Sequence, residues 1–166
     1  MIKKITIVLA LLFMCTGIYA QTKNISVGFV PYGHSYEYGN CLKYGVTLDY
    51  ERRFSDLSGN AGGLTLSGTY FYGNFPKDNH SFSFNVGMEW ILNAKGRVQF
   101  PLGLEFGLGK PLEYSLVCAT AKIRVYITDN LGVFAGSKIT CISKILTEHF
   151  YGIISLNFGI VYTIGK

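Results

Sequence analysis

The stretch 41-CLKYGVTLDYERRF-54 alternates apolar and polar side chains along its length. Every second residue from Leu42 to Tyr50 is apolar or aromatic, and the residues between them are small, polar or charged. Successive side chains of a β-strand point to opposite faces, so this pattern predicts a strand with one apolar and one polar face. In a soluble sheet the charged face meets water, whereas in a transmembrane barrel it faces the interior.

The same period of two recurs to the end of the chain. It predicts eight strands, over residues 24–32, 41–54, 63–73, 81–92, 97–108, 115–127, 131–141 and 151–164. Compact links at 55–60, 93–96 and 128–130 alternate with longer connections. Every second connection of an up-and-down barrel emerges at the same end. We therefore predict an all-β fold, an eight-stranded antiparallel up-and-down transmembrane β-barrel with short turns at one end and loops at the other.

The N-terminus has the pattern of a cleavable signal peptide. Lys3 and Lys4 form a basic region, residues 5–13 an apolar region, and Ala20 ends a small-residue cleavage site. We expect residues 1–20 to be the signal peptide and residues 21–166 to be one barrel domain. No later apolar run is long enough for a spanning helix. Removal of Lys3 and Lys4 lowers the formal charge from +5 to +3, since 13 basic residues then face 10 acidic ones. A net charge this small does not favour nucleic acid as a partner.

Two barrels fit the alternation, each turned inside out relative to the other. In a soluble lipocalin-like barrel the apolar face lines a ligand cavity, and in a membrane barrel it faces lipid. The polar face of this chain is rich in Gly, Ser, Thr and Asn, and charged residues make up only 15% of the sequence. A soluble surface carries charges at about a quarter to a third of its positions. The narrow interior of an eight-stranded barrel favours small residues, so we favour the membrane barrel.

The charges on the polar face are nearly balanced in sign. Buried charges persist only when they are paired and hydrogen-bonded, so we predict a salt-bridge network in the lumen. Its members are Lys43, Asp49, Glu51, Arg53, Glu89, Glu105, Lys122, Arg124 and Lys138. Phe71, Tyr126 and Phe134 fall on the same face. Because these large rings would fill the narrow lumen, a large pore is not expected.

Aromatic residues of the apolar face fall toward the two ends of the predicted barrel. Aromatic bands of this kind are typical of the two interfaces of a membrane. One band contains Tyr50, Phe54, Trp90 and Tyr162 at the short-turn end, and the other contains Tyr44, Tyr70, Tyr72 and Phe82 at the loop end.

The signal ending at Ala20, the eight amphipathic strands and the short turns resemble the small OmpA/OmpX-type outer-membrane β-barrel proteins. The resemblance covers nearly the whole mature chain. It implies a bacterial outer-membrane location, a monomer, and contact with outer-membrane lipid, lipopolysaccharide and the outer-membrane assembly machinery. Such barrels commonly end on an aromatic residue that the assembly machinery reads. This chain departs from that pattern and ends Tyr162-Thr163-Ile164-Gly165-Lys166.

Histidines in or beside the predicted loops are the candidates for chemistry. A histidine can activate a serine when a carboxylate orients it, and some eight-stranded barrels are lipid-modifying enzymes with such a group at the outer rim. The rim candidates are His34, Asp78, His80, Ser81, Glu148 and His149. Histidines in polar loops also occur without a catalytic role. No pair among them has a spacing that fixes metal geometry, so we expect no metal and no cofactor.

The sequence therefore favours a non-catalytic barrel with a structural or cell-surface interaction role. One alternative is a lipid-modifying enzyme of the lipid A deacylase or palmitoyltransferase type. A second is a secreted lipocalin-like barrel that binds an apolar ligand. Three cysteines follow the signal, and at least one of Cys41, Cys118 and Cys141 must be unpaired. Cys118 and Cys141 fall on opposite faces of neighbouring strands, which disfavours a bond between them.

Overall fold

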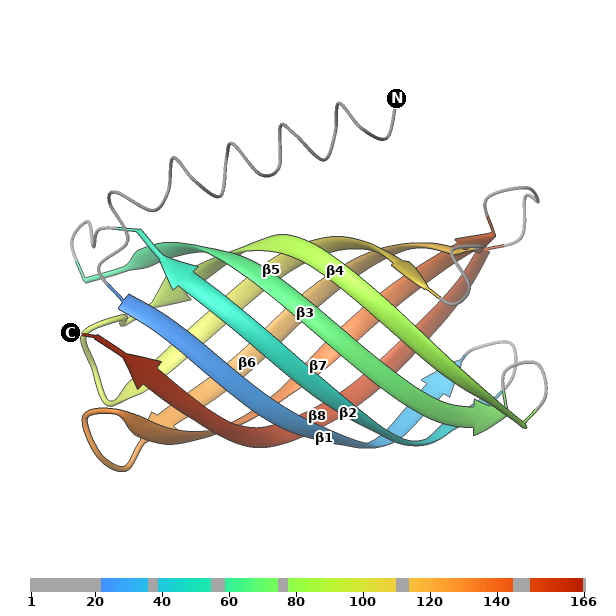
Figure 1. Ribbon diagram of the computed structural model, residues 1–166, viewed down its shortest axis with the longest axis horizontal. Coiled ribbons are helices and arrows are strands. Elements are labelled where there is room, and N and C mark those ends of the chain that lie inside the picture. The colour runs from blue at the N-terminus through green and yellow to red at the C-terminus, as the bar shows by residue number, and fades with distance from the viewer. Residues whose placement is uncertain are drawn as a thin grey trace, which may run out of the picture.

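The computed structural model describes residues 22–35, 39–54, 59–74, 78–109, 114–144 and 150–165, with the backbone alone at some strand ends. These residues form eight strands: β1 (Thr22–Ser35), β2 (Gly39–Arg53), β3 (Ala61–Asn74), β4 (Asp78–Leu92), β5 (Val98–Gly109), β6 (Tyr114–Tyr126), β7 (Leu131–Lys144) and β8 (Phe150–Ile164). Each pairs antiparallel with its neighbours in the chain, and β1 pairs with β8 to close a barrel (Figure 1). The predicted eight-stranded barrel is confirmed, with strand ends within a few residues of those predicted. The predicted signal peptide, residues 1–20, lies outside the described residues.

Two short turns close the end of the barrel where β1 begins and β8 ends, the short-turn end (left in Figure 1). Asn93 has a left-handed backbone with φ of 55°, and its side-chain amide donates to the Val98 carbonyl at 2.7 Å. In the other turn, Thr128 Oγ1 accepts from the backbone N–H groups of Asn130 and Leu131 at 3.3 and 3.0 Å. Short polar side chains favour turns because they bond to nearby backbone groups. The opposite end is the loop end.

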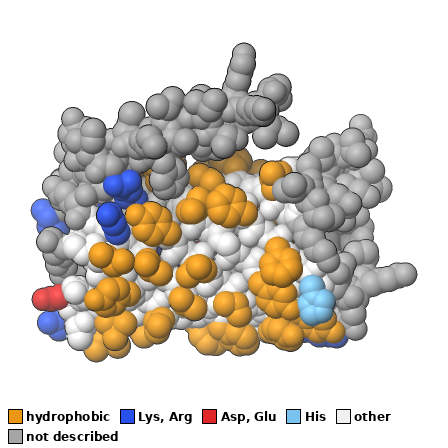
Figure 2. Space-filling model, in the orientation of Figure 1, with side chains coloured by type: hydrophobic (Ala, Val, Ile, Leu, Met, Phe, Trp, Pro, Cys, Tyr) orange, Lys and Arg blue, Asp and Glu red, His pale blue; other side chains and the backbone are white. Residues whose placement is uncertain are grey.

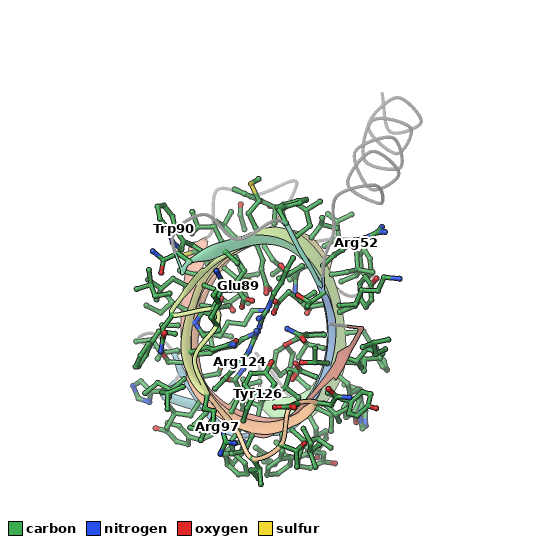
Figure 3. The ribbon with its side chains drawn as sticks, turned by 90° about the vertical axis from the view of Figure 1, so that its left-hand side faces the viewer. Arg52, Glu89, Trp90, Arg97, Arg124 and Tyr126 are labelled. Atoms are coloured by element: carbon green, nitrogen blue, oxygen red, sulfur yellow. The ribbon has the colours of Figure 1, made fainter. Side chains whose placement is uncertain are left out.

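The two faces of the barrel wall differ in chemistry, as Figures 2 and 3 show. Inward-facing positions are mostly small, polar or charged and are buried, whereas the large outward-facing side chains are mainly apolar. The exposed large hydrophobic residues range from 37% exposure at Ile25 to 66% at Met88. The lipocalin-like alternative requires the apolar face inside, so the structure overturns it. No helix among the described residues is long and apolar enough to cross a membrane.

The pairing between β1 and β8 is irregular near the loop end. Odd-numbered residues of β1 point outward up to Phe29, but the register shifts between Phe29 and Tyr32, and Tyr32 and His34 then lie outside. Pro31 occupies this shift. Proline has no N–H to donate and occurs within sheets mainly at edges and bulges. Pro31 therefore explains the shift in register between β1 and β8.

A second irregularity, in β2, corrects the assignment of two side chains. Strict alternation places Leu42 on the outer face and Lys43 in the lumen. In the structure Leu42 is 8% exposed inside the barrel, and Lys43 is exposed on the outer wall. The β2–β3 register shifts between Leu42 and Tyr44, and one extra residue in a strand reverses which face the following side chains point to.

Apolar side chains fill the lumen at two levels. Near the loop end, buried residues and their partly buried neighbours form a cluster that we call the apolar plug: Val30, Leu42, Phe71, Ile142 and Ile153. A second cluster lies closer to the short-turn end and contains Tyr126, Phe134 and Val161. Phe71, Tyr126 and Phe134 thus all lie in the lumen, on the face that the alternation indicated.

Candidate functional site

Charged side chains form a continuous network through the middle of the lumen. Lys122 lies between two carboxylates, with its Nζ 3.1 Å from Asp49 Oδ2 and 3.6 Å from Glu89 Oε1. Arg124 lies between Glu89 and Glu51, with one guanidinium nitrogen 2.9 Å from Glu89 Oε2 and the other 2.5 Å from Glu51 Oε2. Figure 3 shows Arg124 and Glu89 inside the ring of strands. Cations and anions therefore alternate across the lumen from β2 through β6 to β4.

The network continues toward the short-turn end through Glu51. Arg53 Nε donates to Glu51 Oε1 at 2.6 Å, and Arg53 Nη2 donates to Gln99 Oε1 at 2.7 Å. On the other side, the Asn24 amide donates to Glu51 Oε1 at 3.0 Å. The Thr163 hydroxyl donates to Asn24 Oδ1 at 2.7 Å. Asn24 of β1 therefore bonds the Glu51 carboxylate directly, and Thr163 of β8 is linked to the same carboxylate through Asn24.

A further ion pair, separate from this chain of contacts, joins β5 and β7. Lys138 Nζ lies 2.6 Å from Glu105 Oε2, and both side chains are buried. The Ser67 hydroxyl donates to the same carboxylate oxygen at 3.0 Å and accepts from the Asn85 amide at 3.2 Å. Two donors therefore hold this buried carboxylate.

The structure brings together eight of the nine residues predicted for the lumen network. Four are acidic and four are basic, so the set has no formal excess of charge. They are Asp49, Glu51, Glu89 and Glu105 with Arg53, Lys122, Arg124 and Lys138. The exception is Lys43, which lies outside for the reason given above. Removing one partner from a buried pair leaves an uncompensated charge, so each member constrains its neighbours.

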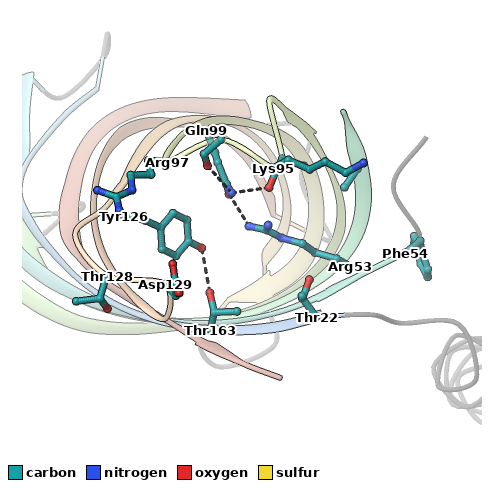
Figure 4. A pocket seen from close by; sticks show the side chains of 13 residues that line it. Thr22, Arg53, Phe54, Lys95, Arg97, Gln99, Tyr126, Thr128, Asp129 and Thr163 are labelled. Atoms are coloured by element: carbon teal, nitrogen blue, oxygen red, sulfur yellow. Dashed lines mark hydrogen bonds between the residues drawn. The ribbon is translucent and has the colours of Figure 1, made fainter. Parts of the chain in front are cut away.

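A pocket of about 450 Å³ opens at the short-turn end (Figure 4). Its labelled lining residues come from both ends of the described chain and from the turns: Thr22, Arg53, Phe54, Lys95, Arg97, Gln99, Tyr126, Thr128, Asp129 and Thr163. The hydroxyls of Tyr126 and Thr163 are 3.2 Å apart, and Arg53 reaches toward Gln99. The pocket is therefore an entrance with a mixed polar and apolar lining that ends on Arg53 and Gln99 of the lumen network.

The three rim candidates whose side chains the structure describes, His34, His80 and Ser81, do not form a catalytic group. His80 is exposed on the outer wall, where its Nδ1 lies 2.6 Å from the Tyr70 hydroxyl. Ser81 is the next residue in β4 and pairs with Phe71 of the apolar plug, on the lumen side. Adjacent strand residues face opposite sides, so His80 cannot act on Ser81 across the wall.

His34 lies on a different part of the wall. It is exposed on β1, and β2 and β3 separate it from the β4 pair of His80 and Ser81. Three strand spacings amount to about 14 Å, well beyond hydrogen-bond distance. Asp78 belongs to β4, but its side chain, and Glu148 and His149 entirely, lie outside the described residues.

The described residues contain no candidate metal cluster. No group of three His, Cys, Asp or Glu side chains in the described part of the chain could hold a metal ion. Cys118 is buried and Cys141 is exposed, and both are free thiols. The side chain of Cys41 is not among those described.

Several neutral side chains that are hydrogen-bonded in the lumen were not among the predicted network residues, Ser67 and Asn85 among them. Asn24, Gln99 and Thr163 connect the charged network to the short-turn end. Each occupies an inward-facing position, so the alternation could have placed it in the lumen. Nothing in the sequence separates these neutral side chains from the other small polar residues of that face. Their role depends on contacts across the barrel, between residues far apart in the chain.

Comparison with known proteins gives matches of structure alone. No family model matches the chain, and no curated protein matches its sequence. The crystal structure of Neisserial surface protein A (NspA) is similar, with a TM-score of 0.58 and 13% sequence identity over 85% of this chain and 94% of that one. The chain has the fold of the small outer-membrane β-barrels.

Two further solved structures support that statement. The Yersinia pestis outer membrane protein Ail, in a phospholipid bilayer nanodisc, has a TM-score of 0.50 and 15% identity over 87% of this chain and 99% of that one. A de novo designed transmembrane β-barrel has a TM-score of 0.50 and 10% identity over 87% and 97%. At these identities the likeness concerns the fold and not the activity.

Proposed function

We propose that this protein is an integral outer-membrane β-barrel with a non-catalytic structural or cell-surface interaction role. The outer wall is the observation that supports this most strongly. Large apolar side chains from seven of the eight strands, all but β3, are exposed on it among the described residues, whereas soluble monomers rarely expose apolar patches larger than a few hundred Å². Its shortest strand, β5, has 12 residues. At about 3.3 Å per residue and a tilt of about 45°, that length spans roughly the 30 Å of a bilayer core.

The orientation and partners follow from the same proposal. The short-turn end lies in the periplasm and the loop end at the cell surface, as in bacterial outer-membrane barrels. The wall contacts outer-membrane lipid and lipopolysaccharide, the assembly machinery inserts the chain, and the barrel works as a monomer. The names of two similar structures, a surface protein and an outer membrane protein, support this location. The filled lumen supports a role other than a large pore.

Cell fractionation combined with a heat-modifiability gel tests the proposal. The native protein is expected in the outer-membrane fraction, extractable only with detergent, and its unboiled form should migrate differently from its boiled form. A protein that is released by salt or buffer alone would refute the proposed location.

Lipid A mass spectra separate this role from that of a lipid-modifying enzyme. Cells with and without the gene are expected to give identical spectra, because His80 and Ser81 face opposite sides of the wall. Acyl chains gained or lost only in the presence of the gene would establish the enzymatic role instead.

A further inference from the structure

The two strand irregularities place polar side chains on the outer wall where regular strands would not. Without the shift in β1, Tyr32 and His34 would face the lumen, and without the shift in β2, Lys43 would do so. In the structure all three are exposed outside. Bulges often re-aim a side chain at a functional position. Both shifts lie near the loop end, on adjacent strands.

One of the re-aimed side chains, Lys43, joins an aromatic cluster of β2, β3 and β4. We call the following five residues the loop-end patch: Lys43, Tyr44, Tyr70, Tyr72 and His80. The rings of Tyr44 and Tyr72 are 5.3 Å apart, and those of Tyr72 and His80 are 5.0 Å apart. Lys43 Nζ lies 5.3 Å from the centre of the Tyr72 ring.

Hydrogen bonds and ring contacts fix the geometry of this patch. The Tyr70 hydroxyl holds His80 Nδ1 at 2.6 Å, and the two rings are stacked at 5.9 Å. The ammonium group of Lys43 is held over the neighbouring ring by a cation–π interaction, which fixes a cation among aromatic faces and hydroxyl groups. In Figure 2 a histidine lies beside hydrophobic side chains toward the loop end of the wall (right).

The charge of the outer wall has a single sign among the described side chains. Their carboxylates lie in the lumen, apart from Asp129 in a short turn. The charges on the described wall are Lys43 at the loop end, and Lys23 and Arg52 at the short-turn end. Cations that flank an apolar band complement anionic groups at the level of lipid headgroups.

We infer that the loop-end patch binds the phosphorylated sugar headgroup of an anionic glycolipid in the outer leaflet. The inference rests on the proposed outer-membrane location. Lys43 and the imidazole and phenol groups supply cationic and neutral donors for phosphate oxygens, and phosphate is bound well by such charge-assisted hydrogen bonds. The exposed ring of Tyr44 presents a flat apolar surface to a sugar ring. A plain phospholipid satisfies the phosphate contacts but not the sugar contacts.

Lipid titration of the purified, detergent-solubilised full barrel tests this site, with native mass spectrometry as the readout. The probes are bisphosphorylated lipid A, monophosphorylated lipid A and phosphatidylglycerol. We expect the wild-type protein to bind bisphosphorylated lipid A most tightly and phosphatidylglycerol most weakly. Lys43→Gln should weaken binding of bisphosphorylated lipid A about 5-fold, since one cation near a membrane surface contributes about 1 kcal/mol.

Lys23→Gln is the matched control, because it removes the same charge from the short-turn end of the same wall. We expect it to leave lipid A affinity unchanged. Equal losses in both variants, or equal affinity of the wild type for lipid A and phosphatidylglycerol, would overturn the site. A heat-modifiability gel first establishes that each variant is folded, and His80→Gln provides a second test if Lys43→Gln does not fold. Fractionation tests the proposed outer-membrane location, and the lipid titration tests the loop-end patch. Each proposal can therefore be refuted without the other.

Discussion

Arg124 connects two carboxylates of the lumen network that come from different strands. It is 2% exposed and bridges Glu51 of β2 and Glu89 of β4 from its place on β6. Each of those carboxylates has a further cationic neighbour, Arg53 or Lys122. A buried ion pair contributes little net stability compared with a well-packed apolar pair, but losing one partner is costly. The cost of a substitution at Arg124 therefore depends on whether it leaves a buried carboxylate without a cation.

Replacing Arg124 with methionine is expected to lower the free energy of unfolding by about 3–5 kcal/mol, because two carboxylates lose their shared cation. Urea unfolding of the reconstituted barrel measures this change. The control is Ile123→Leu on the adjacent, outward-facing position. A volume-conserving exchange of this kind costs less than about 1.5 kcal/mol. Similar values for the two variants would show that the network does not constrain the fold.

Two glycines make room for an aromatic ring in the lumen. Gly28 and Gly159 are paired across β1 and β8, and Phe134 of β7 is the next partner in that row. A Cβ built on Gly28 or on Gly159 would lie 2.9 Å from a ring carbon of Phe134. Other groups lie closer still: Thr47 Oγ1 would be 2.5 Å from a Cβ at Gly28, and the Val27 carbonyl oxygen 2.0 Å from one at Gly159. A side chain at either position would therefore meet both the neighbouring strand and the Phe134 ring.

Gly159→Ala is expected to destabilise the barrel by about 1–3 kcal/mol through overpacking. Gly68→Ala serves as its control, since a Cβ at Gly68 meets nothing within 4 Å. That exchange should change stability by less than about 0.5 kcal/mol. Thermal or urea unfolding of the two variants side by side gives the comparison. If Gly68→Ala proved the more damaging of the two, this account of the lumen packing would be wrong.

At the scale of the strand, alternation predicts the fold because a closed barrel has one inside and one outside. It places Glu89 and Arg124 inward and Trp90 outward, as the structure does (Figure 3). The alternation fails at Lys43, since one inserted residue changes the parity of β2 without changing its composition. The candidate group of His34, His80 and Ser81 fails for a related reason. Nearness in sequence to a loop does not determine which face of the wall a side chain occupies.

The shift in β2 predicts different costs for two leucines of one strand. Leu42→Ala should lower the free energy of unfolding by about 2–5 kcal/mol, because Leu42 packs in the apolar plug against Val30 and Ile153. Leu48 is 57% exposed on the outer wall, so Leu48→Ala should cost clearly less in a detergent micelle. Urea titrations in the same detergent provide the measurement. A strand without the shift would give the reverse order.

At the scale of the whole molecule, the lumen is divided into three levels. The pocket of about 450 Å³ opens at the short-turn end, the charged network lies above it, and the apolar plug closes the described lumen toward the loop end. Water can enter the first level. Salt bridges and buried apolar groups obstruct the next two, because an eight-stranded barrel has little width beyond what its side chains fill. The barrel therefore combines a water-accessible mouth with an obstructed interior.

This arrangement predicts that the purified barrel forms no steady ion channel. In a planar lipid bilayer under applied voltage, the inserted protein should show no stable conductance step, whereas a 16-stranded porin in the same membrane shows large ones. The heat-modifiability gel establishes that the added protein is folded, and co-flotation of the protein with vesicles of the same lipid establishes that it inserts, so silence cannot reflect absent protein. Leu42→Ser with Ile153→Ser opens the plug but leaves the salt bridges of Arg124 and Lys122 in place. This double variant should also remain silent, and a steady current through it would show that the charged network does not obstruct ions.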